Sequence, residues 1–391
     1  MFEPQDHPND FRFPGAPPTP PYDNAGYTLA LQMGVKFDRI LDGFGCPCER
    51  IEPSALVKPA AGTVANGGRW VISPAQNDAF TAVARLLKGG VDVTRLANGD
   101  FSVPANGKSR PIVTKAATEL GVTFAAATGS SAGTKVTLPR IGLWDRYGGS
   151  MPSGHTRWLL EKFGYDYTLV YASDLDAGNL RAKYDVLVFV DGAIPGRVAA
   201  GAGEGFGGAG PDTATLPPEW RKTVARVTAE KTVPQLKAFM EAGGRVITIG
   251  SSTALADHLG LPIDNYLMEG GKRLPQEKYY VPGSLLEVRY DASSALARGA
   301  GETGIVVFDN SPVFKLGSDA AAKGVKRVAW FEKAPLRSGW AWGEQYLEGG
   351  TAIAEAAVGQ GTLYLFGPEV LFRGQPHATF RLFFNALTGA K

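Results

Sequence analysis

The sequence has 391 residues, of which 44% are hydrophobic and 20% are charged, a balance that excludes a disordered chain. Lys and Arg total 40 against 38 Asp and Glu, which leaves a net charge of +2, so neither nucleic acid nor a membrane surface is an expected partner. The clear apolar runs are the length of a strand and fall short of the roughly 20 residues of a membrane-spanning helix. We expect two or three domains of about 150 residues each.

Residues 1–54 are predicted to form a proline-rich arm and connector. Seven prolines lie within residues 1–23, and proline lacks a backbone donor, so this stretch cannot be a helix or an inner strand. A short helix capped by Asn24 and ending at Met33 is predicted next, followed by a strand that begins at Val35. The opening residues are acidic and do not resemble a signal peptide.

The two cysteines, Cys46 and Cys48, are too few for a disulfide framework or for a zinc site built from cysteine. Because a bridge between residues two apart would be strained, we expect two free thiols in a turn around Pro47. The histidines form no HExxH motif, and no metal or other cofactor is expected to bind this chain.

Residues 55–137 are predicted to form a small α+β domain. Strands and helices are expected in the order β-α-β-β-α-β, at residues 70–72, 77–88, 91–96, 101–103, 112–120 and 122–124. This order is typical of a ferredoxin-like unit, a fold that hosts many functions and assigns none. The stretch from 125 to 135 is rich in small residues and is predicted to be a linker.

Residues 138–391 are predicted to form an α/β domain with a doubly wound parallel sheet. The expected strands are 140–144, 167–171, 184–190, 245–249, 285–290, 304–308, 325–331, 351–358 and 362–366, and the expected helices are 156–163, 233–242, 255–259 and 379–387. Repeated β-α units with apolar strands are typical of parallel sheets, whose ligands lie beyond the carboxyl ends of the strands.

A glycine-rich stretch interrupts this domain between residues 192 and 218. Glycines 203, 205 and 208 have the spacing of a dinucleotide-binding loop. That loop joins a strand directly to a helix, whereas here the preceding strand ends a dozen or so residues earlier. A flexible insertion is therefore the better interpretation.

A strand ending at Ile249 is followed by G-S-S-T-A and a helix, which is close to the G-x-S-x-G nucleophile elbow. Ser252 would be the nucleophile, and the helix N-terminus would hold an oxyanion. A serine-rich helix cap has the same pattern, and a nucleophilic serine needs a base. His258 lies on the elbow's own helix, which leaves His377 as the candidate base and Glu369 as the residue that would orient it.

The last predicted strand ends in F-G-P-E, from Phe366 to Glu369. This ending resembles the F-H-P-E of class I glutamine amidotransferases, in which His and Glu serve a Cys in a G-x-C-x-G elbow. Here Ser252 stands at the nucleophile position and Gly367 at the base position, so only Glu369 is retained. The resemblance implies the fold of that family with its catalytic triad lost.

Four further stretches are distinctive: FEPQDHPND and PGAPPTPPYDNAGYTLALQMGVKFDRILDGF within residues 2–44, RIGLW and HTRWLLEKFG within 140–164, NLRAKYDVLV at 179–188, and FRGQPHATFRLFFNAL at 372–387. They resemble the region that follows the catalytic domain in large bacterial zinc carboxypeptidase-like proteins of the M14 family. The resemblance implies that zinc binds only in an N-terminal peptidase domain absent from this chain, which would be its partner in cis. It also suggests export, and we expect Met1 to be an internal methionine or a boundary.

Ten residues are candidates for a site. The strand ends would gather polar side chains at one edge of the sheet, and others follow the last strand or open the first helix: Asp145, Arg146, His155, Arg157, Asp191, Ser251, Ser252, Glu369, Arg373 and His377. Trp144, Tyr147 and Trp158 add aromatic area suited to a sugar or a peptide. The alternative is that the charged residues form structural ion pairs and the aromatic residues belong to the core.

The favoured hypothesis is a non-catalytic accessory region of an M14-type protein, which packs against, orients or oligomerises the peptidase domain or holds substrate. One alternative is a stand-alone serine hydrolase that uses Ser252, His377 and Glu369. Another is a sugar- or peptide-binding module that uses the same strand-end cleft. A homo-oligomer is compatible with each of these hypotheses.

Overall fold

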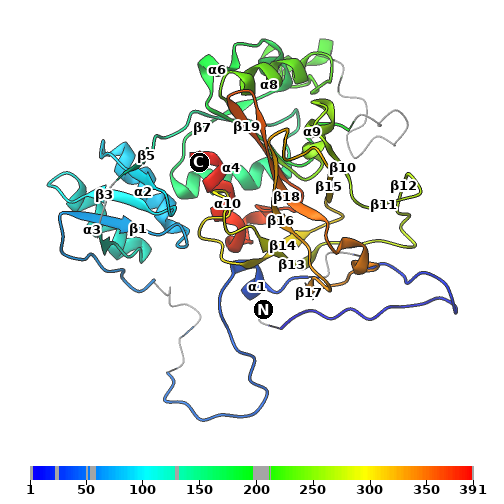
Figure 1. Ribbon diagram of the computed structural model, residues 1–391, viewed down its shortest axis with the longest axis horizontal. Helices are drawn as coiled ribbons and strands as arrows, with labels where there is room; N and C mark the ends of the chain where they lie inside the picture. Colours follow the sequence, from blue (N-terminus) through cyan, green and yellow to red (C-terminus); the bar gives the residue numbers. More distant parts are fainter. Residues whose placement is uncertain are drawn as a thin grey trace.

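A computed structural model describes residues 3–22, 26–49, 52, 59–127, 132–196, 211 and 213–389, which form an arm, a small unit and a large unit (Figure 1). The predicted cap Asn24 and the glycines of the dinucleotide-like spacing lie outside these residues. No helix in the part of the chain that the structure describes is long and apolar enough to span a membrane.

The arm contacts the large unit through its first part and contains one short helix, α1 (Leu29–Met33), while residues 35–49 loop away from both units (Figure 1). The backbone N–H of Gln5 donates to Ser338 Oγ at 2.8 Å, and the Thr28 hydroxyl donates to the carbonyl of Glu3 at 2.7 Å. The predicted strand from Val35 does not form, since residues 35–41 pair with no other strand in the described chain.

The expectation of free thiols is wrong. Cys46 and Cys48 form a disulfide, with Cα atoms 5.1 Å apart. That separation falls within the range that disulfides span, so the turn between the two residues brings them close enough to be bridged.

The small unit carries a five-stranded antiparallel sheet. Its elements are β1 (Arg69–Ile72), α2 (Asp78–Lys88), β2 (Thr94–Leu96), β3 (Phe101–Pro104), α3 (Ser109–Leu120), β4 (Ala125–Ala126) and β5 (Gly133–Lys135). The spatial order is β4-β1-β3-β2-β5. The first four strands have the order of a split β-α-β unit, as the sequence pattern predicts. The predicted linker instead supplies β4 and β5, and Phe124, at the end of the last predicted strand, forms an isolated bridge with Val64.

The large unit contains a sheet in two halves. The parallel half is built from β6 (Ile141–Trp144), β7 (Tyr167–Val170), β8 (Val186–Phe189), β9 (Arg245–Ile249) and β19 (Gly361–Phe366), in the order β19-β9-β8-β6-β7. Every residue of β6 and β8 is buried, so both faces of this half are covered. The helices are α4 (Met151–Phe163), α5 (Ala172–Asp176), α6 (Leu180–Lys183), α7 (Pro218–Arg221), α8 (Thr232–Glu241), α9 (Leu255–His258) and α10 (His377–Thr388).

The other half of the sheet is antiparallel, which corrects the prediction of a parallel sheet throughout. It continues from β19 through β18 (Thr351–Val358), β16 (Val325–Trp330), β13 (Ser284–Tyr290) and β14 (Thr303–Phe308). Shorter strands β10 (Ile263–Asn265), β15 (Phe314–Leu316) and β17 (Leu336–Ser338) attach beside it, and β11 (Met268–Glu269) pairs with β12 (Lys272–Arg273). Residues 284–366 contain no α-helix, and a parallel connection requires a long crossover.

Helix α2 of the small unit lies against α4 of the large unit (Figure 1). Aromatic side chains of α2, α4 and α10 make this contact. Phe80 of α2 stacks on Phe384 of α10 with ring centroids 5.2 Å apart, and Phe163 of α4 lies 4.5 Å from Phe384. Beside these rings, the buried Arg95 Nη2 donates to Asn385 Oδ1 at 2.8 Å. Asn385 Nδ2 in turn donates to the carbonyls of Leu296 and Arg298.

Asn385→Ala should destabilise the protein by about 2–4 kcal/mol, because it leaves a buried cation and two carbonyls without partners. Nε and Nη1 of Arg95 already lack partners in the described chain, and burial lowers the pKa of Arg95 to about 10. Urea unfolding measures the effect, with the exposed Asn98→Ala as the control. Equal losses of stability in the two variants would show that the contact between the units does not depend on Asn385.

Candidate functional site

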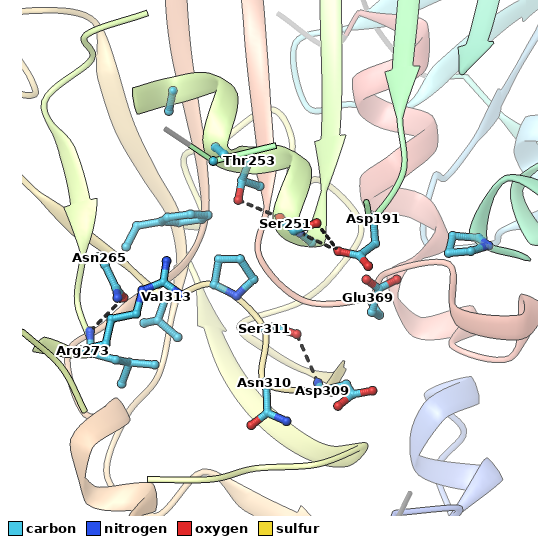
Figure 2. A pocket seen from close by; sticks show the side chains of 18 of the residues that line it. Asp191, Ser251, Thr253, Asn265, Arg273, Asp309, Asn310, Ser311, Val313 and Glu369 are labelled. Atoms are coloured by element: carbon cyan, nitrogen blue, oxygen red, sulfur yellow. Dashed lines mark hydrogen bonds between the residues drawn. The ribbon is translucent and has the colours of Figure 1, made fainter. Parts of the chain in front are cut away.

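A cleft of about 1090 Å³ opens where β8, β9 and β19 end and where loops of the antiparallel half face them (Figure 2). Asp191 comes shortly after β8, Gly250 and Ser251 directly after β9, and Glu369 shortly after β19. Asp309 follows β14 and enters from the antiparallel half. The predicted edge of the sheet is therefore occupied by a cleft, as parallel strands favour.

Gly250 makes the turn between β9 and the following 3-10 helix (Gly250–Ala254), with a left-handed φ of +59°. A Cβ built on Gly250 would stand 2.5 Å from Asp191 Oδ1 and 2.7 Å from Glu369 Oε1. In a nucleophile elbow the reactive side chain stands on the strained residue of the turn. Here that residue is glycine, so the alignment that puts Ser252 at the nucleophile position is two residues too late.

Ser252 is fully buried and its hydroxyl is occupied by backbone groups. It donates to the carbonyl of Val190 at 2.5 Å and accepts from the N–H groups of Ala193 and Ile194 at 3.0 and 3.1 Å. These bonds fasten the chain after β8 to the turn after β9. The assignment of Ser252 as an exposed nucleophile is therefore corrected, since its proton points to a main-chain oxygen.

His377 begins α10 at the contact with the small unit. Its ring packs on Phe380 at 4.8 Å between centroids, and its carbonyl accepts from Asn77 Nδ2 at 2.7 Å. Burial lowers the pKa of His377, and the nearby charge of Asp78 raises it. His377 is not among the described residues that line the cleft, so the structure does not bring the predicted base to Ser252.

Glu369 and Asp191 face each other beside Gly250 (Figure 2). Asp191 Oδ1 accepts from the N–H and the hydroxyl of Ser251, both at 2.7 Å. The Glu369 carboxyl has no hydrogen-bond partner within the described ranges. Burial, with the charges of Asp191 and Asp309, raises the pKa of Glu369 to about 8. Near neutral pH the pair therefore holds a proton, as close carboxyl groups do.

His155 and Arg373 also line the cleft, as predicted for the strand-end edge. The N–H of Arg373 donates to His155 Nδ1 at 3.1 Å. Burial and the charge of Arg373 lower the pKa of His155, so its imidazole is neutral at pH 7.

Three predicted ligand-binding residues lie outside the set of side chains that line the cleft. Arg157 pairs with the buried Asp145 at 3.8 Å and donates from Nε to the Tyr167 hydroxyl. Asp145 also accepts from the backbone N–H of Arg146 at 2.8 Å. For Arg157 and Asp145 the structural ion pair is thus the better interpretation. Trp144 is buried in the core.

The far wall of the cleft was not predicted from the sequence. It comes from residues 263–280 and 309–314, and includes Asn265, Arg273, Tyr279 and Tyr280. The one signal in the sequence was the polar run of Asp309 to Ser311 directly after a predicted strand. The residues around 270 carry no strong helix or strand pattern, so nothing placed them near β9.

A metal site does not emerge from the described side chains, because they include no group of three or more His, Cys, Asp or Glu residues arranged to hold an ion.

No family model matches the chain, and no curated protein matches it. Similar solved structures include a putative GMP synthase component from Thermoplasma acidophilum, with 12% identity over 64% of this chain and 92% of that chain and a TM-score of 0.37. PurLQS from Thermotoga maritima has 14% identity over 65% of this chain and 100% of that chain, with a TM-score of 0.38. A β-galactosidase from Bacillus circulans sp. alkalophilus has 11% identity over 63% of this chain and 31% of that chain, with a TM-score of 0.33. Likeness at this level carries no argument about activity, and the chain is a mixed α/β protein.

Gly250→Ala should destabilise the protein by about 2–4 kcal/mol, since the new methyl group needs a left-handed backbone and meets two carboxyl oxygens. Gly149→Ala is the matched control, because Gly149 also has a left-handed φ, of +80°, but has open space around it. Urea unfolding should show the larger loss for Gly250→Ala. Equal losses would mean that the carboxyl groups do not crowd Gly250.

Proposed function

We propose that this chain is a non-catalytic accessory module of an M14-type zinc carboxypeptidase-like protein, and that its strand-end cleft holds a ligand. The observation that carries the proposal is the turn after β9. Gly250 supplies no side chain there, and the carboxyl groups of Asp191 and Glu369 fill the space that a nucleophile would use. The four sequence stretches that resemble M14-type proteins support the choice of parent family.

The parallel half of the sheet supports a class I glutamine amidotransferase-like fold whose catalytic groups have been replaced. The F-G-P-E ending of β19 carries Glu369 to the carboxyl edge, next to the turn after β9. A Cβ at Gly367 would stand 2.1 Å from the carbonyl of Pro312, so a histidine in that place would require the backbone to move. A catalytic base at position 367 is thus disfavoured by the packing around it, and the residue there is a glycine.

The positions of Ser252 and His377 argue against a stand-alone serine hydrolase. A working nucleophile needs a hydrogen bond to its base and an exposed oxygen. Ser252 offers neither, because its hydroxyl is buried and bonded to the main chain. His377 lies near Asp78 of the small unit and packs on Phe380 of its own helix.

The shape of the cleft favours binding. Ligand sites are concave and largely apolar, with a few convergent polar groups. The apolar part of the cleft wall is formed by Ile263, Val313 and Phe314. Polar side chains, among them Asp191 and Glu369, converge on one end.

The arm offers a surface for an accessory role. Ile40, Leu41 and Phe44 are 61%, 78% and 67% exposed on a stretch without helix or strand. Exposed apolar side chains close together are typical of contact surfaces between domains. The proposed occupant is the peptidase domain in cis.

The mass of the native gene product, immunopurified from its source, tests this proposal. A product more than twice the 41.4 kDa of this chain, with stoichiometric zinc and carboxypeptidase turnover, is expected. A native product of 41.4 kDa would contradict the accessory role. So would zinc-dependent peptidase turnover by the isolated chain.

Fluorophosphonate labelling distinguishes the serine hydrolase alternative from the accessory role. We expect no labelling of the isolated chain, because the Ser252 hydroxyl is inaccessible. Labelling that Ser252→Ala abolishes, and that a control such as Ser173→Ala retains, would establish the hydrolase instead.

A further inference from the structure

We propose that the cleft binds an organic cation, whose ammonium or guanidinium group sits among the carboxyl groups of Asp191, Glu369 and Asp309 and displaces a proton held there. This inference rests on the proposed function only in that the cleft holds a ligand. Neither the M14 resemblance nor the missing triad specifies the charge of that ligand.

The first observation is that three carboxyl groups converge on one cleft. Asp191, Glu369 and Asp309 follow three different strands, β8, β19 and β14, and all three line the same cleft (Figure 2). Asp191 and Glu369 each have an oxygen within 2.7 Å of the point where a Cβ on Gly250 would stand. No Lys or Arg side chain pairs with any of the three carboxyl groups in the described ion pairs. An acidic cluster without a counter-charge is the complement of a cation.

The second observation is an unsatisfied hydroxyl on a residue of the cleft wall. Tyr279 is 8% exposed and lines the cleft, and its buried hydroxyl has no hydrogen-bond partner among the described atoms. Buried polar groups nearly always form a hydrogen bond, so one without a partner in the protein indicates a partner outside it. A ligand with hydrogen-bonding groups along its length would supply one.

An organic cation fits better than a metal ion. The described side chains form no group of three that could coordinate a metal. One oxygen of Asp191 is already taken by Ser251. An ammonium or guanidinium group needs only hydrogen-bond acceptors on several sides, which these carboxyl groups provide.

Binding should be linked to a proton. The pKa of Glu369 is raised to about 8 by burial and by the charges of Asp191 and Asp309. A cation favours the ionised carboxylate, so it should expel the proton when it binds. The other charged or titratable groups on the cleft are Arg273, Arg373, Asp257, Asp264 and His155. Burial and the charge of Arg373 lower the pKa of His155, so its imidazole does not gain charge above pH 7. Affinity should therefore rise about tenfold between pH 7 and pH 9.

Isothermal titration with agmatine and cadaverine tests the proposal, with pentanediol, glutarate and Mg²⁺ as comparison probes. We expect saturable binding of the two cations, about tenfold tighter at pH 9 than at pH 7. Titration at pH 7 in two buffers of different ionisation enthalpy should show release of close to one proton per ligand. Glu369→Gln should weaken binding and abolish both the pH dependence and the proton release.

Glu355→Gln is the matched control. Glu355 of β18 is also partly buried with a raised pKa, but it does not line the cleft. This variant should bind the cations as the native chain does, and thermal unfolding of both variants checks that they are folded.

The proposal is overturned if neither cation binds at either pH, if Glu369→Gln binds as well as the native chain, or if only Mg²⁺ binds. Binding of pentanediol or glutarate alone would also overturn it, while leaving a ligand-holding cleft in place. The accessory role is judged separately, by the mass of the native product.

Discussion

One strand, β19, joins the two halves of the large sheet, and the position of the site depends on it. It pairs in parallel with β9 on one side and antiparallel with β18 on the other. Its carboxyl end therefore faces both the turns of the parallel half and the loops of the antiparallel half. Glu369, which follows β19, comes to lie between Asp191 from one half and Asp309 from the other.

The turn at Gly250 determines what that meeting point can do. A glycine in a left-handed conformation leaves room for two carboxyl groups where an elbow would present a nucleophile. Ser252, two residues later, is used to fasten the neighbouring loop. The same short segment thus offers no side chain at the strained position of the turn and borders an acidic pocket, which is why the proposed binding role fits the site better than hydrolysis.

Much of the fold follows from hydrophobic periodicity. The apolar strands near Val188 and Ile247 and the β-α-β-β-α-β order of the small unit are local patterns, and the structure contains them. The strands of the antiparallel half alternate in direction because no helices connect them. The order of predicted strands alone does not reveal this. At the site, Asp191, Ser251 and Glu369 were predicted because they end strands. The orientation of the Ser252 hydroxyl and the position of Tyr279 in the cleft wall were not predicted, because both arise from tertiary packing.

The burial of Glu369 beside two other carboxyl groups is tested most directly by titrating its carboxyl with carbon-13 NMR, with Glu369→Gln used to assign its signal. The structure predicts one side-chain carboxyl with a pKa of about 8 whose signal disappears in this variant. Such a value requires that Glu369 be buried beside Asp191 and Asp309, as the geometry around Gly250 dictates. A Glu369 signal that titrates near the ordinary value of about 4.3 would contradict it, since the carboxyl would then be solvated and apart from its neighbours.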